Sequence, residues 1–219
     1  MAETYLVADP ALIARWAQAW AISRGADAPV ERDGGLYIHV GQPEQIGRYI
    51  FATLDTAAIV PLARTIDRPL LYLKICAPAD YVRPLLPKGW EIATPGYMMT
   101  APLSIMLDTA PVVPDDLSLT LTRDPAGIIF AAVVDGEGEE AARGRIVPTG
   151  DMVVFDNIRT AEGHQRRGLG SAVMRALATE ADRAGATDAM LCATPEGRAL
   201  YASLGWDFHS DYTTASLSV

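Results

Sequence analysis

Residues 164–174 read HQRRGLGSAVM, and this stretch decides which fold we expect. It stands between an apolar segment, residues 152–160, and an amphipathic segment, residues 169–183, which predict a strand and a helix. A helix N-terminus has unpaired backbone N–H groups and a partial positive charge, and a glycine-containing loop lets a phosphate approach them closely. The stretch therefore predicts a pyrophosphate-binding loop that opens a helix, in which the two glycines and two arginines have a common purpose.

The spacing of the glycines separates this loop from two other phosphate loops. A Walker A loop needs a GK[ST] ending, and GxGxxG needs a further glycine, and neither occurs here. Gln165-x-x-Gly168-x-Gly170 instead resembles the acetyl-CoA loop of the GNAT superfamily of N-acetyltransferases. The downstream segment LYASLGW, residues 200–206, is similar to the family's L-Y-x-x-L-G-F segment, with Trp206 in place of phenylalanine. The resemblance covers about residues 117–219, and it is favoured over a plain glycine-started helix with a surface arginine pair.

The resemblance implies an α/β fold with a mixed sheet, and the periodicity along the chain agrees with it. Asp9 and Pro10 open a helix that Gly25 ends, which is the usual chemistry of helix caps. Further helices are predicted at residues 54–66, 80–86, 169–183 and 196–204. Strands are predicted at residues 37–40, 46–51, 70–75, 117–121, 128–134, 141–147, 152–160, 189–193 and 206–212, with extended chain after residue 90. The acidic segment 135–140 is predicted to be a hairpin tip.

An internal echo suggests two related halves. Cys76 precedes Trp90 by the same distance as Cys192 precedes Trp206, and the predicted element order repeats at the same offset. With the linker-like residues 109–116, this favours a degenerate N-terminal GNAT-like half at 1–110, which has a structural or acceptor-site role, and a catalytic domain at 111–219. The first half has no loop like that at 165–170, so one active site is expected.

The resemblance assigns functions to specific residues. It implies that backbone groups of the strand end bind the pantetheine arm, that the loop binds pyrophosphate, and that a tyrosine protonates the leaving thiolate. For Tyr201 the alternative is a core tyrosine whose hydroxyl is bonded to backbone. The expected cofactor-binding residues are Ile158, Arg159, Thr160, Gln165, Arg166, Arg167, Gly168, Leu169, Gly170 and Ser171.

Asp156 is the candidate general base, because it is an acid in the strand that leads to the loop. By alternation it shares a face with Val154 and Ile158. The alternation alone leaves open that it is a solvent-facing or hairpin-paired carboxylate instead. Ser203 has no histidine and carboxylate at a recognisable spacing, so a hydrolase triad is unsupported.

Composition narrows the class of partner. The chain has 219 residues, a net charge of −9 and a pI near 4.8, which disfavour nucleic acid and anionic membranes as partners. Cys76 and Cys192 lack metal-ligand spacing, so we expect two buried, reduced thiols and no metal. No signal peptide and no apolar stretch of membrane-spanning length is visible, so we expect a cytoplasmic protein. Exposed strand edges leave a homodimer open.

We therefore expect an N-acetyltransferase that uses acetyl-CoA as co-substrate. The acceptor is a small-molecule amine, an amino acid or a peptide amino terminus, and it attacks the thioester directly in a ternary complex. No helix pair fits between the strands at 117 and 128, where the family has its acceptor-binding wall. The alternatives are a non-catalytic CoA-binding regulatory or scaffold protein, and an acyltransferase that uses a longer acyl-CoA or an aminoacyl-tRNA.

Overall fold

The structure, a computed structural model, describes residues 7–218 and divides into two compact units. The first unit comprises residues 7–99 and 192–218, and the second comprises residues 100–191. The chain passes from one unit to the other within β6 (Gly96–Pro102) and within β11 (Asp188–Ala193). Each unit is described by itself below.

The first unit is a mixed sheet whose strands follow the order β1-β2-β3-β4-β12, with β5 paired to β12. Only β3 and β4 run parallel among these pairs, and α2 connects them. Its elements are α1 (Pro10–Arg24), β1 (Val30–Arg32), β2 (Gly35–Gln42), β3 (Gln45–Phe51), α2 (Thr56–Thr65), β4 (Leu71–Ile75), α3 (Ala79–Val82), the 3-10 turn η1 (Arg83–Leu85), β5 (Trp90–Ile92), α5 (Pro195–Ser203) and β12 (Asp207–Leu217).

Strand alternation gives the sheet of the first unit two different faces. Tyr49, Phe51, Leu73 and Ile75 point to one face, where they form an apolar core with α2 and α3. The intervening residues of β3 and β4 point to the opposite face, where α1 packs against β2. Apolar side chains are therefore buried on both faces of this sheet, under α2 and α3 on one face and under α1 on the other.

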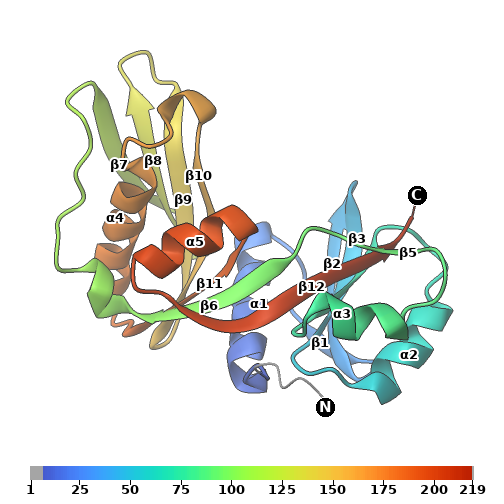
Figure 1. Ribbon diagram of the computed structural model, residues 1–219. Helices are drawn as coiled ribbons and strands as arrows, with labels where there is room; N and C mark the ends of the chain where they lie inside the picture. The colour runs from blue at the N-terminus through green and yellow to red at the C-terminus, as the bar shows by residue number, and fades with distance from the viewer. Residues whose placement is uncertain (1–6, 219) are drawn as a thin grey trace. The chain divides into compact units, whose positions relative to one another are not determined.

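The second unit is a meander of four antiparallel strands, to which β11 adds in parallel beside β10. Helix α4 connects β10 to β11 and packs along β8, β9 and β10, as Figure 1 shows. Its elements are the 3-10 turn η2 (Leu103–Met106), β7 (Leu117–Arg123), β8 (Ile129–Asp135), β9 (Glu140–Thr149), β10 (Met152–Thr160), the 3-10 turn η3 (Glu162–His164), α4 (Leu169–Arg183) and the start of β11.

The mixed α/β fold is confirmed, and so is the repeated element order. Each unit contains a parallel strand pair joined by a helix, β3-α2-β4 in one and β10-α4-β11 in the other. In chain order, α3 and then β5 follow the first pair, and α5 and then β12 follow the second. The duplication and the functional division at residues 110 and 111 stay predictions.

Helix ends follow the cap residues. Asp9 accepts the N–H of Ala11, Pro10 occupies the first turn, and Gly25 closes α1 in the left-handed region at φ 61°. Helix α2 begins at Thr56 rather than at 54, because Asp55 is its N-cap. Pro84 lies in the 3-10 turn that follows α3, so the helix predicted at 80–86 is shorter.

Three other expectations are modified. Strand β12 extends to Leu217, beyond the predicted end at 212, and β1 was not predicted. The prediction of two buried thiols is wrong for Cys192, which is exposed, whereas Cys76 is buried, and neither cysteine forms a disulfide within the described residues. Cys192 alternates with Leu191 and Ala193, which point to the buried side of β11, so its own side chain points the other way.

The acidic segment 135–140 is a hairpin tip, in which Asp135 accepts the N–H groups of Glu137 and Glu139.

Candidate functional site

The loop between β10 and α4 is a row of backbone donors. Gly168 is the N-cap of α4 in the left-handed region at φ 77°, and no side chain caps the helix. The first helical hydrogen bond runs from the N–H of Ala172 to the carbonyl oxygen of Gly168 at 3.0 Å. In the described part of the chain, the backbone N–H groups of residues 166–171 have no acceptor. Such a row at a helix N-terminus is an anion-binding cradle.

The corresponding helix of the first unit has no such cradle. The connection from β3 to α2 is only four residues long, and Asp55 caps the helix. Its Oδ1 accepts the N–H of Ala57 at 3.0 Å and that of Ala58 at 3.2 Å. A carboxylate of the protein itself therefore occupies the place that an anionic ligand would need at α2.

The two loop glycines differ in backbone conformation and in the space available for a side chain. Gly168 needs its positive φ, a conformation that side chains with a Cβ rarely adopt. Gly170 has no such φ, and a Cβ built on it would meet Thr160 Oγ1 at 3.6 Å, an ordinary contact. The fold thus requires glycine at 168 but not at 170, where the space above the backbone is open.

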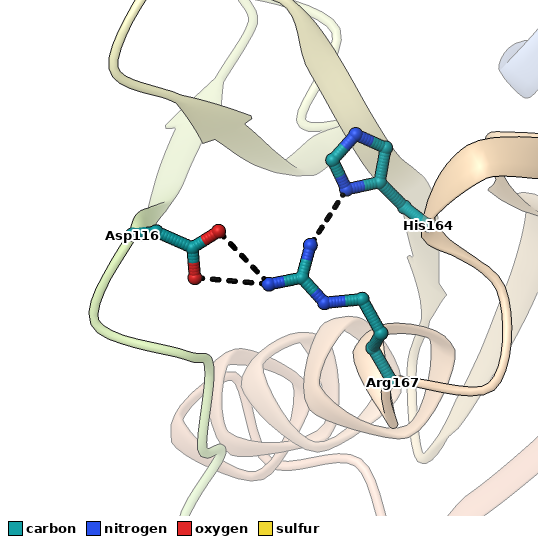
Figure 2. A network of polar contacts seen from close by, with 3 residues as sticks. All are labelled: Asp116, His164 and Arg167. Carbon is teal, nitrogen blue, oxygen red and sulfur yellow. Dashed lines mark hydrogen bonds and ion pairs between the residues drawn. The ribbon is translucent and has the colours of Figure 1, made fainter.

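Arg167 has two partners in the structure, as Figure 2 shows. Its Nη2 donates to both carboxylate oxygens of Asp116 at 2.9 Å. Its Nη1 lies 3.0 Å from His164 Nδ1, which accepts from the guanidinium in the tautomer that carries its proton on Nε2. The hydrogen bond from Arg167 is the main cause that lowers the pKa of the exposed Asp116 carboxyl. Asp116 is therefore bound to the guanidinium of Arg167, which lies beside the anion-binding cradle.

The strand before the loop separates from its parallel neighbour. The ladder between β10 and β11 runs from the pair Met152–Asp188 to the pair Phe155–Leu191 and stops there, whereas β10 continues to Thr160. A bulge follows at Asn157, whose φ is 56°. The predicted pantetheine-binding residues 158–160 lie beyond both the end of the ladder and the bulge.

The bulge corrects one expectation. Asp156 and Ile158 were expected on one face, but the extra residue resets the alternation. Ile158 lies on the α4 side, where a Cβ on Gly144 would meet its Cδ1, as well as Val173 Cγ1 at 2.8 Å. Asp156 lies on the opposite face, directly across from Arg145.

Asp156 forms an ion pair across the hairpin. Its Oδ2 accepts from Nε and Nη2 of Arg145 at 3.1 and 3.0 Å, and the side chains are only 12% and 18% exposed. This is the hairpin-paired arrangement that the sequence left open. The base role of Asp156 stays a prediction, and the ion pair gives the residue a structural role beside it.

Tyr201, in α5 of the first unit, is 8% exposed and packs against Trp206, with ring centroids 6.0 Å apart. Burial raises the pKa of its phenol to about 12. Its hydroxyl makes no hydrogen bond to any residue that the structure describes, so the alternative of a hydroxyl bonded to backbone finds no support. A phenol that stays protonated and has no hydrogen-bond acceptor among the described residues can donate a hydrogen bond to a ligand.

The other predicted residues have varied surroundings. Leu169 is buried in the core of the second unit, so only its backbone can serve the cradle. Gln165, Arg166 and Arg159 are exposed, and Thr160 and Ser171 are partly buried. Sequence reasoning missed Asp116 and Arg145, the partners of Arg167 and Asp156.

Comparison with known proteins agrees with this geometry. Residues 97–206, about half of the chain, match the model described as the acetyltransferase (GNAT) family. The chain belongs to this family. A search of curated proteins finds no match.

Solved GNAT structures resemble this GNAT chain over most of its length. A GCN5-related N-acetyltransferase from Kribbella flavida has a TM-score of 0.68 at 16% identity and covers 95% of each chain. A protein described as a GNAT-family acetyltransferase from Novosphingobium aromaticivorans has a TM-score of 0.56 at 14% sequence identity, and the match covers 94% of this chain and 99% of that one. A tandem GNAT protein from the clavulanic acid biosynthesis pathway has a TM-score of 0.54 at 15% sequence identity, and the match covers 74% of this chain and 67% of that one. At these identities the likeness shows the fold.

Two further findings concern the described residues as a set. None of their helices is long and apolar enough to cross a membrane. No group of three or more histidine, cysteine, aspartate or glutamate side chains among them is placed to hold a metal ion.

Proposed function

We propose that this GNAT protein is an N-acetyltransferase that moves an acetyl group from acetyl-CoA to a primary amine in a ternary complex. One observation carries the proposal: the backbone N–H groups of residues 166–171 have no acceptor in the described chain and stand at an uncapped helix N-terminus. An anionic ligand would satisfy donors that the fold leaves unpaired. The family supplies the class of reaction.

The residues present fit acetyl-CoA. The pyrophosphate would be held by the backbone N–H groups of residues 166–171, with Arg166 and Arg167 adding positive charge. The unpaired side of β10 at residues 158–160 would bind the pantetheine arm. When bound, acetyl-CoA supplies a thioester whose acyl carbon an amine can attack.

Tyr201 and Asp156 are the proposed proton carriers. Tyr201 keeps its proton through the neutral range, because burial holds the pKa near 12, and it would stabilise the leaving thiolate by donating a hydrogen bond. The acceptor must lose a proton to attack, and Asp156 is the proposed base for that step. Its bond to Arg145 means that the carboxylate is also needed to balance a half-buried guanidinium.

The acceptor is proposed to be a small amine, an amino acid or a peptide amino terminus. We propose that residues 1–110 act structurally and help shape the acceptor site, that residues 111–219 are catalytic, and that the protein is cytoplasmic. Asp55 at α2 supports this division, because it occupies the first unit's helix N-terminus with the protein's own carboxylate.

Acetyl-CoA binding and amine-dependent thiol release test the proposal together. Native protein should bind acetyl-CoA with micromolar affinity by calorimetry, and the double variant Arg167→Glu, Gly170→Glu should not. Arg64→Glu, an exposed charge reversal in α2, is the matched control and should bind as the native protein does. Release of free CoA with some member of a panel of amines separates an enzyme from a CoA-binding scaffold protein. Equal rates with longer acyl-CoA substrates would instead favour a different donor.

A further inference from the structure

Two cations lie on the α1 side of the first unit's sheet. Arg48 of β3 is only 7% exposed, its guanidinium lies 3.4 Å from the ring centroid of Trp20, and its Nη2 donates to Gln45 Oε1 at 2.5 Å. Lys74 of β4 is largely buried, and its Nζ donates to Thr214 Oγ1 of β12 at 2.8 Å. Both positions alternate with the apolar residues that face α2.

No carboxylate among residues 7–218 balances these charges. Neither cation has an acid as a hydrogen-bond or ion-pair partner within the described residues. Burial, together with repulsion by Arg48, lowers the pKa of Lys74 to about 7. Burial is likewise the main cause that lowers the pKa of Arg48. Buried charges normally persist in proteins only when they are paired, so two unbalanced cations side by side call for a counter-charge.

Further buried polar groups lie on the same side of the sheet as the two cations. Arg48 Nε has no hydrogen-bond partner among the described residues, whereas Tyr212 forms a side-chain hydrogen bond with Arg48, and Ser210 forms one with Cys76. Tyr212 is 3% exposed, and it interacts electrostatically with Arg48. Ser210, Tyr212 and Thr214 alternate along β12 and therefore share a face. We call Arg48, Lys74, Ser210, Tyr212 and Thr214 the cationic cluster.

We propose that the cationic cluster binds the carboxylate group of a small molecule. The cluster offers N–H and O–H donors with a net positive charge, and a carboxylate brings one negative charge and several acceptor sites. Lys74 is partly exposed and the neighbouring Cys192 is exposed, so the cluster borders solvent. The source is either an amino-acid acceptor, which rests on the proposed function, or a free organic acid.

Binding should be coupled to protonation of Lys74. The groups that face it are Arg48 from β3, Tyr212 and Thr214 from β12 and Cys192 from β11, with Tyr72 on its own strand. Burial raises the pKa of Tyr212 well above its usual value, so this phenol stays neutral near pH 7. A carboxylate prefers the ammonium form, so it should bind about tenfold more weakly at pH 8 than at pH 6.

Thermal unfolding in sodium acetate tests this proposal. At matched ionic strength against sodium chloride, acetate should raise the Tm of native protein saturably, with the tenfold pH dependence. Lys74→Met should lose both effects, whereas Lys88→Met, which removes the exposed lysine, should keep them, as should Cys192→Ser. Stabilisation of Lys74→Met equal to that of native protein, or no acetate effect beyond chloride, would overturn the proposal. Tighter binding of phosphate than of acetate would overturn the choice of carboxylate.

Acceptor kinetics identify the source of the carboxylate. If it belongs to the acceptor, Lys74→Met should raise KM for L-alanine and leave KM for L-alaninamide unchanged. If a free acid binds, acetate should change the rate without competing with either amine. Acetyl-CoA binding to Lys74→Met should equal that of native protein, so failure of the cluster proposal is distinguishable from failure of the proposed function.

Discussion

Asp116 and Arg167 are 51 residues apart in the chain, yet both carboxylate oxygens of Asp116 lie 2.9 Å from Nη2 of Arg167. The pair is partly exposed, and it ties the segment before β7 to the loop that opens α4. An anion bound at the loop would compete with Asp116 for the same guanidinium.

Asp116→Asn should tighten acetyl-CoA binding by about 2- to 5-fold, because the ligand no longer competes with a weak, exposed ion pair for Arg167. The gain should shrink at high salt, which screens the charge of Arg167. Calorimetry at two salt concentrations measures it. Asp115→Asn removes the neighbouring charge, for which no bond to the loop is found, and should leave the affinity unchanged. Weaker binding by Asp116→Asn would mean that the aspartate positions Arg167 for the ligand.

The two loop glycines should respond oppositely to alanine. Gly168→Ala should lower the free energy of unfolding by about 1 kcal/mol or more, because alanine is strained at φ 77°. Gly170→Ala should raise it by up to about 1 kcal/mol, because the residue lies in α4 with room for a Cβ. Urea unfolding of both variants measures the contrast. Equal destabilisation would show that the loop conformation is not as described.

Tyr201→Phe should lower kcat by about 100-fold or more and leave acetyl-CoA affinity unchanged, because only the proton donor is removed. The acid must be protonated to act, and its pKa near 12 predicts no loss of activity from this group as pH rises to about 10. Steady-state kinetics from pH 6 to 10 measure both effects. A variant with native kcat would return Tyr201 to a packing role.

Lys74→Met should stabilise the protein most at low pH. The folded-state pKa near 7 lies below the usual 10.5, so the unfolded chain binds more protons between these values and native stability falls as pH drops through this window. The advantage of methionine should be complete below about pH 7 and should disappear toward pH 10.5. Urea unfolding at pH 6 and pH 9.5 measures the free energy of unfolding of the native protein and of Lys74→Met, with Lys88→Met as control. A pH-independent difference would contradict the burial of an unbalanced ammonium.

Much of the fold follows from local chemistry that is visible in the sequence. Asp9, Pro10 and Gly25 bound α1 because cap chemistry involves only neighbouring residues. The cradle was equally predictable, since its donors are backbone groups that the glycine spacing of the loop exposes.

The side-chain partners were less accessible. The tight turn between β9 and β10 sets their register, so the pairing of Asp156 with Arg145 was within reach of sequence reasoning. The bulge at Asn157 could not be predicted, because a one-residue insertion in a strand leaves no recognisable pattern of apolar residues in the sequence. The role of Asp116 could not be predicted either, because its hydrogen bond to Arg167 joins two segments that are 51 residues apart and meet only in the folded chain. The cationic cluster joins β3, β4 and β12, which no local pattern connects.

The first measurement to make is a calorimetric titration of the purified protein with acetyl-CoA, in which the native protein is compared with the double variant Arg167→Glu, Gly170→Glu. We expect micromolar binding by the native protein and by Arg64→Glu, and none by the double variant. Absence of binding by folded native protein would contradict the assignment of the loop at residues 166–171 as the donor site, and with it the proposed acetyltransferase activity.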